Sequence, residues 1–313
     1  MKELNKKDLN SIELNPLLSE LRSSSKVGKG QNCIFESFDQ TQIFYRKWKP
    51  KGKVQQIIIT CHGMSGHGEY FVILADKLVP DGAMVIAIDY RNHGYSDGKK
   101  GDIKSFKNIL KDLNVFQSYI ELKYPETPVF LFGQSMGGTV IINYAEYYQD
   151  SFARLNGIIL TSPAIKIGFS KSQWLLAGLA ALFLMPIRLL LPSLRIIPAR
   201  GGEEKNIRNS IHIQYDKDDP LHLDKLSLRY LLQAFKHIRK CKKIAEKITI
   251  PALGFHGGAD TGISPQGTAS FFEKIASQDK KFICIKEGLH ALITDDLFEN
   301  QWEIIMQWIN EHS

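Results

Sequence analysis

Cysteine is scarce in this 313-residue chain, which has only Cys33, Cys61, Cys241 and Cys284. No two of them form a CxxC pair, so neither a zinc knuckle nor a disulfide scaffold is indicated. The His, Cys and Asp residues nowhere show the spacing of metal ligands, and we expect neither a metal nor a cofactor. Thiols without partners are typical of a reducing compartment, so the expected location is cytoplasmic.

Long apolar runs are also lacking. The first residues are broken by charges and contain no apolar core of about 7–15 residues, as a signal peptide would need. The most apolar segment, residues 174–197, runs for about 14 residues before Arg188, whereas a membrane span needs about 20. Two interpretations of this segment stay open. It forms a helix packed on the core, or it lines an acyl-chain tunnel and dips into a lipid surface.

Basic residues exceed acidic ones, 40 to 33, which gives a net charge of +7 and a pI of about 9.0. Such a charge suits an anionic membrane surface or a nucleic acid. The predicted helix at residues 229–247 carries much of the excess, either as a solvated face or as an attraction for anionic lipid head groups. Because no nucleic-acid-binding module accompanies the charge, we expect no nucleic acid partner. Peripheral membrane contact is retained as an alternative.

Short apolar runs alternate with amphipathic stretches along most of the chain. An antiparallel hairpin is predicted over residues 33–48. Strands that are apolar on both faces are typical of a buried parallel sheet. The alternation therefore predicts an α/β fold with a mostly parallel, doubly wound sheet. The expected strands are 54–60, 83–90, 129–134, 157–162, 252–257 and 282–287, and the expected helices are 69–80, 103–124, 137–149, 266–277 and 297–312.

The alternation stops between Pro163 and about Pro251, where the texture is helical and no convincing strand is found. We interpret residues 164–250 as an inserted helical cap over the carboxyl ends of the strands, where ligands bind in such sheets. The predicted organisation is an N-terminal arm (1–30), a first core part (31–163), the cap (164–250) and a second core part (251–313).

The strongest local motif is G-x-S-x-G at residues 133–137, directly after a predicted strand and directly before a predicted helix. Both flanks match a nucleophile elbow, in which glycines relieve crowding around the serine. Ser135 is therefore the predicted nucleophile. It needs a base within hydrogen-bond reach and a third group to orient that base.

Chain order in this fold places the acid after the serine and the histidine last. Asp260 follows one late strand and His290 follows the last strand, which predicts that both lie at the same edge as Ser135. Asp89, Asp295 and Asp296 are competitors for the acid role. The first follows an earlier strand, and the other two are expected to cap the last helix.

An oxyanion hole needs two main-chain N–H groups, one from the residue after the nucleophile and one from an earlier loop. The first is assigned to Met136. The second is assigned to Met64, which follows the pair His62-Gly63 at a strand end. We interpret His62 as a structural side chain that braces this loop, and residues 89–98 as a structural turn near the site.

Together these motifs resemble the monoglyceride lipase and lysophospholipase branch of the α/β-hydrolase family, over about residues 30 to 313. The resemblance rests on His62-Gly63, DYRNHGYSDG (89–98), Tyr124-Pro125, GQSMGG (133–138), Thr161-Ser162-Pro163, Asp219-Pro220, Gly258-Ala259-Asp260 and Gly288-Leu289-His290. It implies an α/β-hydrolase fold and a serine ester hydrolase without metal or cofactor. Such an enzyme cleaves one acyl chain from a monoacylglycerol or lysophospholipid under a mobile hydrophobic cap.

Three positions depart from the pattern of many monoglyceride lipases. Gln134 stands where they have a histidine, Gly66 stands at an acidic position, and Glu69 lies near the position of an arginine. The acidic residue and the arginine contact glycerol in those relatives, so these differences bear on which head group the enzyme recognises.

Three alternatives to a monoacyl-lipid hydrolase remain. A short-chain carboxylesterase would use the same triad. A non-catalytic relative that binds lipid or protein has no physical need for all three groups. An aminopeptidase on this fold would want an acidic cap pocket, whereas this cap is basic.

Overall fold

The computed structural model describes residues 25, 27–168, 170, 172, 185–200 and 203–313. Its centre is an eight-stranded sheet with the strand order β1-β2-β4-β3-β5-β6-β9-β10. The strands are β1 (Gln31–Glu36), β2 (Gln42–Trp48), β3 (Gln56–Cys61), β4 (Ala83–Ile88), β5 (Val129–Gln134), β6 (Gly157–Thr161), β9 (Ala252–Gly257) and β10 (Lys280–Ile285). The predicted α/β-hydrolase fold is thus confirmed, with each expected strand present within a few residues.

Strand directions follow from the length of the connections. β1 and β2 form the predicted antiparallel hairpin, whose turn contains Gln40 with a φ of 65°. β2 also runs antiparallel to β4. Every pairing from β4 through β10 is parallel, because each of these connections is long enough to cross over the sheet. The carboxyl ends of these strands therefore meet at one edge.

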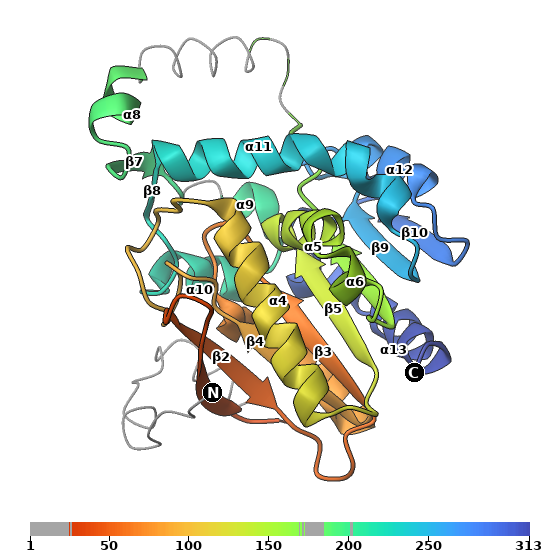
Figure 1. The fold of residues 1–313 in the computed structure, drawn as a ribbon. Coiled ribbons are helices and arrows are strands. Elements are labelled where there is room, and N and C mark those ends of the chain that lie inside the picture. The colour runs from red at the N-terminus through yellow and green to blue at the C-terminus, as the bar shows by residue number, and fades with distance from the viewer. Residues whose placement is uncertain (1–24, 26, 169, 171, 173–184, 201–202) are drawn as a thin grey trace.

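Helices cover both faces of the sheet, as the apolar strands require (Figure 1). One face packs against α4 (Phe106–Lys123), α5 (Met136–Tyr147), α11 (Leu228–Ile244) and α12 (Pro265–Lys274). The other packs against α3 (Val72–Leu78) and α13 (Gln301–Glu311). Alternate residues of one strand enter the two cores: Ile57 and Ile59 of β3 pack on the first face and Ile58 on the second.

Several helix boundaries differ from the predictions. The segment expected as one helix at 69–80 consists of α3 between two 3₁₀ turns, η1 (Gly68–Phe71) and η2 (Val79–Asp81), the second of which contains Pro80. α13 begins only at Gln301, after the 3₁₀ turns η4 (Leu292–Thr294) and η5 (Asp296–Phe298). A short helix, α6 (Gln149–Phe152), follows α5.

Between β6 and β9 the chain contains α8 (Met185–Leu190), α9 (Glu203–Asn206), α10 (Ser210–Asp218), α11 and the 3₁₀ turn η3 (Ala245–Lys247). The expectation that this segment has no strand was wrong. β7 (Arg195–Pro198) and β8 (Lys225–Ser227) pair as a small antiparallel sheet. These strands have four and three residues, too few for a period-two pattern to be read from the sequence.

Part of the apolar segment 174–197, residues 174–184, lies outside the described residues. In the described remainder, Leu189, Leu190, Leu191 and Leu194 are exposed to solvent rather than packed on the core. α8 and β7, the elements on either side of Leu191 and Leu194, lie at one end of α11 (Figure 1).

Candidate active site

The turn between β5 and α5 carries Ser135. β5 ends at Gln134 and α5 begins at Met136, which leaves Ser135 alone between strand and helix, with φ 53° and ψ −117°. This conformation is costly for a side chain and is held by the surrounding structure. The turn also passes close to β3, since a Cβ placed on Gly137 would lie 1.9 Å from the Cys61 carbonyl oxygen. Glycine is therefore the residue that lets the turn form here.

Two later strands bring the other predicted residues to Ser135. Asp260 follows β9 and His290 follows β10, at the same edge as the end of β5. Ser135 Oγ lies 2.9 Å from His290 Nε2, and His290 Nδ1 lies 2.6 Å from Asp260 Oδ2. A carboxylate oxygen only accepts, so Nδ1–H donates to Asp260 and Nε2 is left to accept the serine proton.

Asp260 is held as a carboxylate by four donors. Burial would raise its pKa, but hydrogen bonds from His256 and His290 outweigh that effect and keep it below the usual range. The backbone N–H groups of Gly262 and Ile263 each donate to Oδ1 at 2.9 Å. His256, whose Nε2 lies 3.1 Å from Oδ2, was not singled out from the sequence, because its apolar strand gives no signal of a polar contact.

The competing carboxylates have other partners. Asp89 accepts from the backbone N–H groups of Gly68 and Tyr95. Asp295 forms an ion pair with Arg208 and caps η5, so the expectation that it caps the last helix was wrong, since that helix begins later.

One predicted oxyanion residue directly follows the serine, and the other lines the same cavity. Met136 is the first residue of α5, where N–H groups have no acceptor within the helix. Met64 lines the cavity next to Ser135. His62 is buried; its Nδ1 donates to the Gly63 carbonyl and its Nε2 accepts from the Tyr90 N–H, which are the contacts of a side chain that braces a loop. Burial holds its pKa well below the ordinary value, so the ring is neutral.

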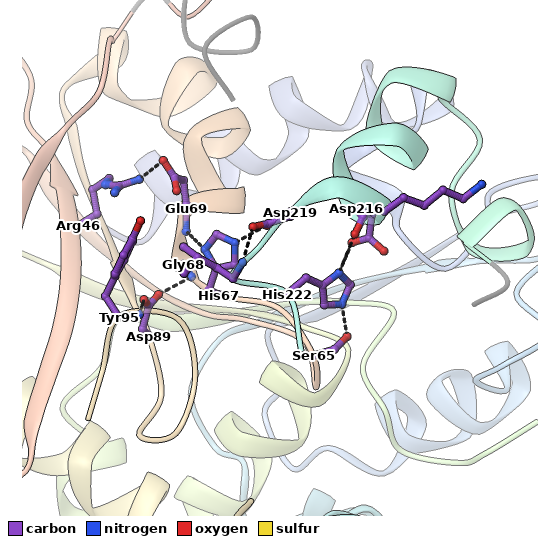
Figure 2. A network of polar contacts seen from close by, with 12 residues as sticks. Arg46, Ser65, His67, Gly68, Glu69, Asp89, Tyr95, Asp216, Asp219 and His222 are labelled. Carbon is purple, nitrogen blue, oxygen red and sulfur yellow. Dashed lines mark hydrogen bonds and ion pairs between the residues drawn. The ribbon is translucent and has the colours of Figure 1, made fainter. Parts of the chain in front are cut away.

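A cavity of about 210 Å³ opens over Ser135 and His290. Its polar lining includes Ser65, Asp216 and His222, which form a chain of contacts (Figure 2). His222 Nδ1 lies 2.9 Å from Asp216 Oδ1, and His222 Nε2 contacts Ser65 Oγ. This group could not be predicted from the sequence, because Asp216 and His222 lie in the segment between β6 and β9 while Ser65 follows β3.

The structure shows where the three residues that depart from the family pattern lie, namely Gly66, Glu69 and Gln134. Glu69 does not line the cavity; it is buried in an ion pair with Arg46 (Figure 2). Gly66 and Gln134 do line it. His67, next to Gly66, is buried against Asp219, with 2.6 Å between Nε2 and Oδ2. The Glu69 N–H donates to Nδ1 of the same ring, so Nε2 carries the proton given to Asp219.

No group of three His, Cys, Asp or Glu side chains is placed to hold a metal ion within the described part of the chain. In the same residues, no helix combines the length and apolar character needed to cross a bilayer. All four thiols are free.

Comparison with known proteins decides the family. Residues 52–296 match the family model described as "Serine aminopeptidase, S33". The chain belongs to this family. It is a serine hydrolase with the α/β-hydrolase fold, as the resemblance implied.

Proteins named as monoglyceride or monoacylglycerol lipases are similar to this chain over most of their length. Human monoglyceride lipase is 27% identical over 281 residues, which cover 88% of this chain and 89% of the human protein. The crystal structure of the Paleococcus ferrophilus monoacylglycerol lipase superimposes with a TM-score of 0.73 at 26% identity, covering 87% of this chain and 99% of that one. The Saccharomyces cerevisiae monoglyceride lipase, solved with a substrate analogue, has a TM-score of 0.79 at 21% identity, covering 93% and 97%.

Proposed function

We propose that this protein hydrolyses the ester bond of monoacyl lipids and releases a single fatty acyl chain through an acyl-enzyme intermediate. The observation that carries the proposal is the chain of hydrogen bonds from Ser135 through His290 to Asp260, at 2.9 and 2.6 Å, inside a cavity at the strand ends. The names of the similar proteins support an acyl ester as substrate.

The geometry supports a two-step reaction. Ser135 Oγ attacks the carbonyl carbon while His290 Nε2 takes its proton, and the negative oxygen is held by the N–H groups of Met64 and Met136. Collapse of this intermediate breaks the ester C–O bond, and His290 returns the proton to the leaving alcohol. Water, deprotonated by His290, then attacks the acyl carbon. The bond between this carbon and Ser135 Oγ breaks, His290 returns the proton to Oγ, and the fatty acid is released. Asp260 stabilises the imidazolium in both steps.

The lining of the cavity favours a head group without negative charge. Among the described residues that line it, Asp216 is the only carboxylate, and neither lysine nor arginine is present. A phosphate would meet a carboxylate there and no fixed cation to neutralise it. Glycerol hydroxyls, in contrast, can donate to Asp216 or exchange hydrogen bonds with Ser65. A monoacylglycerol therefore suits this cavity better than a lysophospholipid.

Contact with a lipid surface forms part of the proposal. Leu189, Leu190 and Leu191 are exposed, and shortly after them in the chain Ser193 Oγ lies 3.3 Å from Nζ of Lys99. On α11 the outward face carries the exposed residues Lys236, Arg239, Lys242 and Lys243. Apolar side chains next to cationic ones are the combination that binds anionic membrane surfaces.

The serine assignment is tested by labelling with a fluorophosphonate, which reacts with activated serines. Ser135→Ala should abolish both labelling and ester hydrolysis. Ser65→Ala is the matched control, because Ser65 also contacts a histidine that is paired with an aspartate in the same cavity. It should still be labelled, since Ser65 lies outside a strand–helix elbow. Labelling that persists in Ser135→Ala and is lost in Ser65→Ala would overturn the assignment.

The substrate is tested by measuring kcat/KM for monoacylglycerols, lysophosphatidylcholine and short esters side by side. Rates should rise with acyl chain length and should be higher for the glycerol head group than for the phosphate-bearing one. A maximum at acetyl or butyryl esters would instead establish a short-chain carboxylesterase.

A further inference from the structure

The loop that carries Met64, residues 62–67, is irregular backbone between β3 and η1. Residues from the segment between β6 and β9 make three bonds to two of its positions, Ser65 and His67. The Leu223 N–H donates to the Ser65 carbonyl at 2.9 Å. His222 contacts the Ser65 hydroxyl, and Asp219 pairs with His67 (Figure 2). The loop is therefore held by a segment that also contributes Asp216 and His222 to the lining of the cavity.

A fourth attachment reaches the proposed oxyanion residue itself. The hydroxyl of Tyr230, a fully buried residue of α11, lies 2.6 Å from the Met64 carbonyl oxygen. The same hydroxyl oxygen lies 3.5 Å from the sulfur of Met136. A single hydroxyl from the segment between β6 and β9 thus contacts both residues whose N–H groups are assigned to the oxyanion hole.

His93 is the other neighbour of the Met64 carbonyl. Its Nε2 lies 3.0 Å from that oxygen and 2.9 Å from the Tyr230 hydroxyl, while its Nδ1 lies 3.0 Å from the Arg91 carbonyl. Burial lowers the pKa of His93 to about 4, so near pH 7 the ring has one N–H for two carbonyls. Tyr230 can donate to the Met64 carbonyl whichever tautomer His93 adopts, whereas His93 can do so in only one tautomer.

The position of such a loop matters because oxyanion donors act only when they are aimed at the developing charge. Loss of one donor typically costs about 10²- to 10³-fold in kcat. Donors on irregular backbone need supporting contacts to keep their geometry. An anchor on the carbonyl of Met64 restricts the orientation of the same residue whose N–H faces the reaction.

We propose that Tyr230 is a positioning residue for ester hydrolysis: its hydroxyl holds the Met64 backbone in the orientation that stabilises the oxyanion. The rate of acylation therefore depends on a residue of the segment between β6 and β9. This inference rests on the proposed function. It assigns to Tyr230 no contact with substrate, so its effect belongs in the chemical step rather than in binding.

The test is Tyr230→Phe, which removes the hydroxyl and keeps the ring. Tyr144→Phe is the matched control, because Tyr144 is also fully buried and its hydroxyl bonds to Gln117 and Asn114, away from the cavity. With p-nitrophenyl butyrate as a soluble substrate, Tyr230→Phe should lower kcat about ten-fold with KM within about two-fold, a fraction of the loss of a whole donor. Its rate of labelling by a fluorophosphonate should fall in parallel. Tyr144→Phe should keep both rates, while the two variants lose similar amounts of thermal stability.

Three results would overturn the inference: a wild-type kcat in Tyr230→Phe, an equal loss of kcat in both variants, or a change confined to KM. Ser135→Ala is measured in the same series. If Ser135→Ala is inactive and Tyr230→Phe is normal, only this inference fails. If Ser135→Ala remains active and labelled, the proposed function fails as well.

Discussion

Ser135 takes a backbone conformation that serine rarely adopts, and its neighbours show why that strain is tolerated. The Ser135 N–H donates to the Thr161 carbonyl at 3.0 Å, and the Ser135 carbonyl accepts from the Ala164 N–H at 2.9 Å. These bonds to β6 and the residues after it fix the elbow from both sides. Strain of this kind persists at functional sites because the surrounding structure determines it.

We expect Asp260 to act in catalysis through its negative charge rather than through the shape of its side chain. Asp260→Asn keeps the shape of the side chain but removes the charge that orients His290 and stabilises its imidazolium. We expect kcat to fall by about 10³- to 10⁴-fold with little change in KM. Asp279→Asn is the control, since Asp279 also pairs with a histidine, His312 at 2.8 Å, and does not line the cavity. Steady-state kinetics on a soluble ester would contradict the assignment if Asp260→Asn stayed within ten-fold of the wild type.

At the scale of elements, the end of α10 is joined to the loop after β3 by the buried pair of Asp219 and His67. Burial would raise the pKa of Asp219, but the hydrogen bond from His67 outweighs this and lowers it from 3.8 to about 2. A carboxyl group whose folded pKa is depressed stabilises the fold above its unfolded pKa, and that stabilisation is lost as the pH falls toward the folded pKa.

The corresponding prediction concerns stability at acid pH. Because Asn does not titrate, the gap in unfolding free energy between wild type and Asp219→Asn should shrink by about 1 kcal/mol from pH 6 to pH 3. The wild type loses the contribution of Asp219 in that interval and the variant has none to lose. Urea unfolding at the two pH values measures the gap. A gap that stays constant, or widens on acidification, would show that the pair does not lower the pKa of Asp219.

Across the molecule, exposed basic and apolar residues belong to elements that adjoin each other. The chain has a net charge of +7; its exposed basic residues on α11 lie in the C-terminal half of that helix, and α8, with exposed Leu189 and Leu190, lies near the N-terminal end (Figure 1). Substrates with one acyl chain reside in membranes or micelles, so attraction to such a surface would bring the cavity to its substrate. Salt screens this attraction, because the basic side chains are solvated.

The whole-molecule prediction is a loss of membrane binding in the variant with Leu189, Leu190 and Leu191 all changed to Ser. Partition onto vesicles of phosphatidylcholine and phosphatidylserine should fall at least about ten-fold, because three apolar side chains no longer enter the lipid. Leu122→Ser is the control, since Leu122 is 84% exposed but lies on α4, outside this surface. Co-sedimentation measures the partition. Equal binding by the triple variant and the wild type would remove these leucines from the proposed contact.

Features that depend on local order could be predicted from the residues alone: the alternation of strands and helices, the elbow around Ser135, and the placement of Asp260 and His290 after late strands. Periodicity and turn chemistry are written in neighbouring residues, so they can be read without a structure. The remaining features, two short strands and several side-chain contacts, became visible only in the folded structure. β7 and β8 are too short to leave a pattern, and no local motif marks His256, four residues before Asp260, as a partner of that carboxylate. Ser65 meets His222, and Met64 meets Tyr230, across more than 150 residues. Such contacts depend on how separate elements pack, because no local pattern specifies which distant side chain will fill a given position.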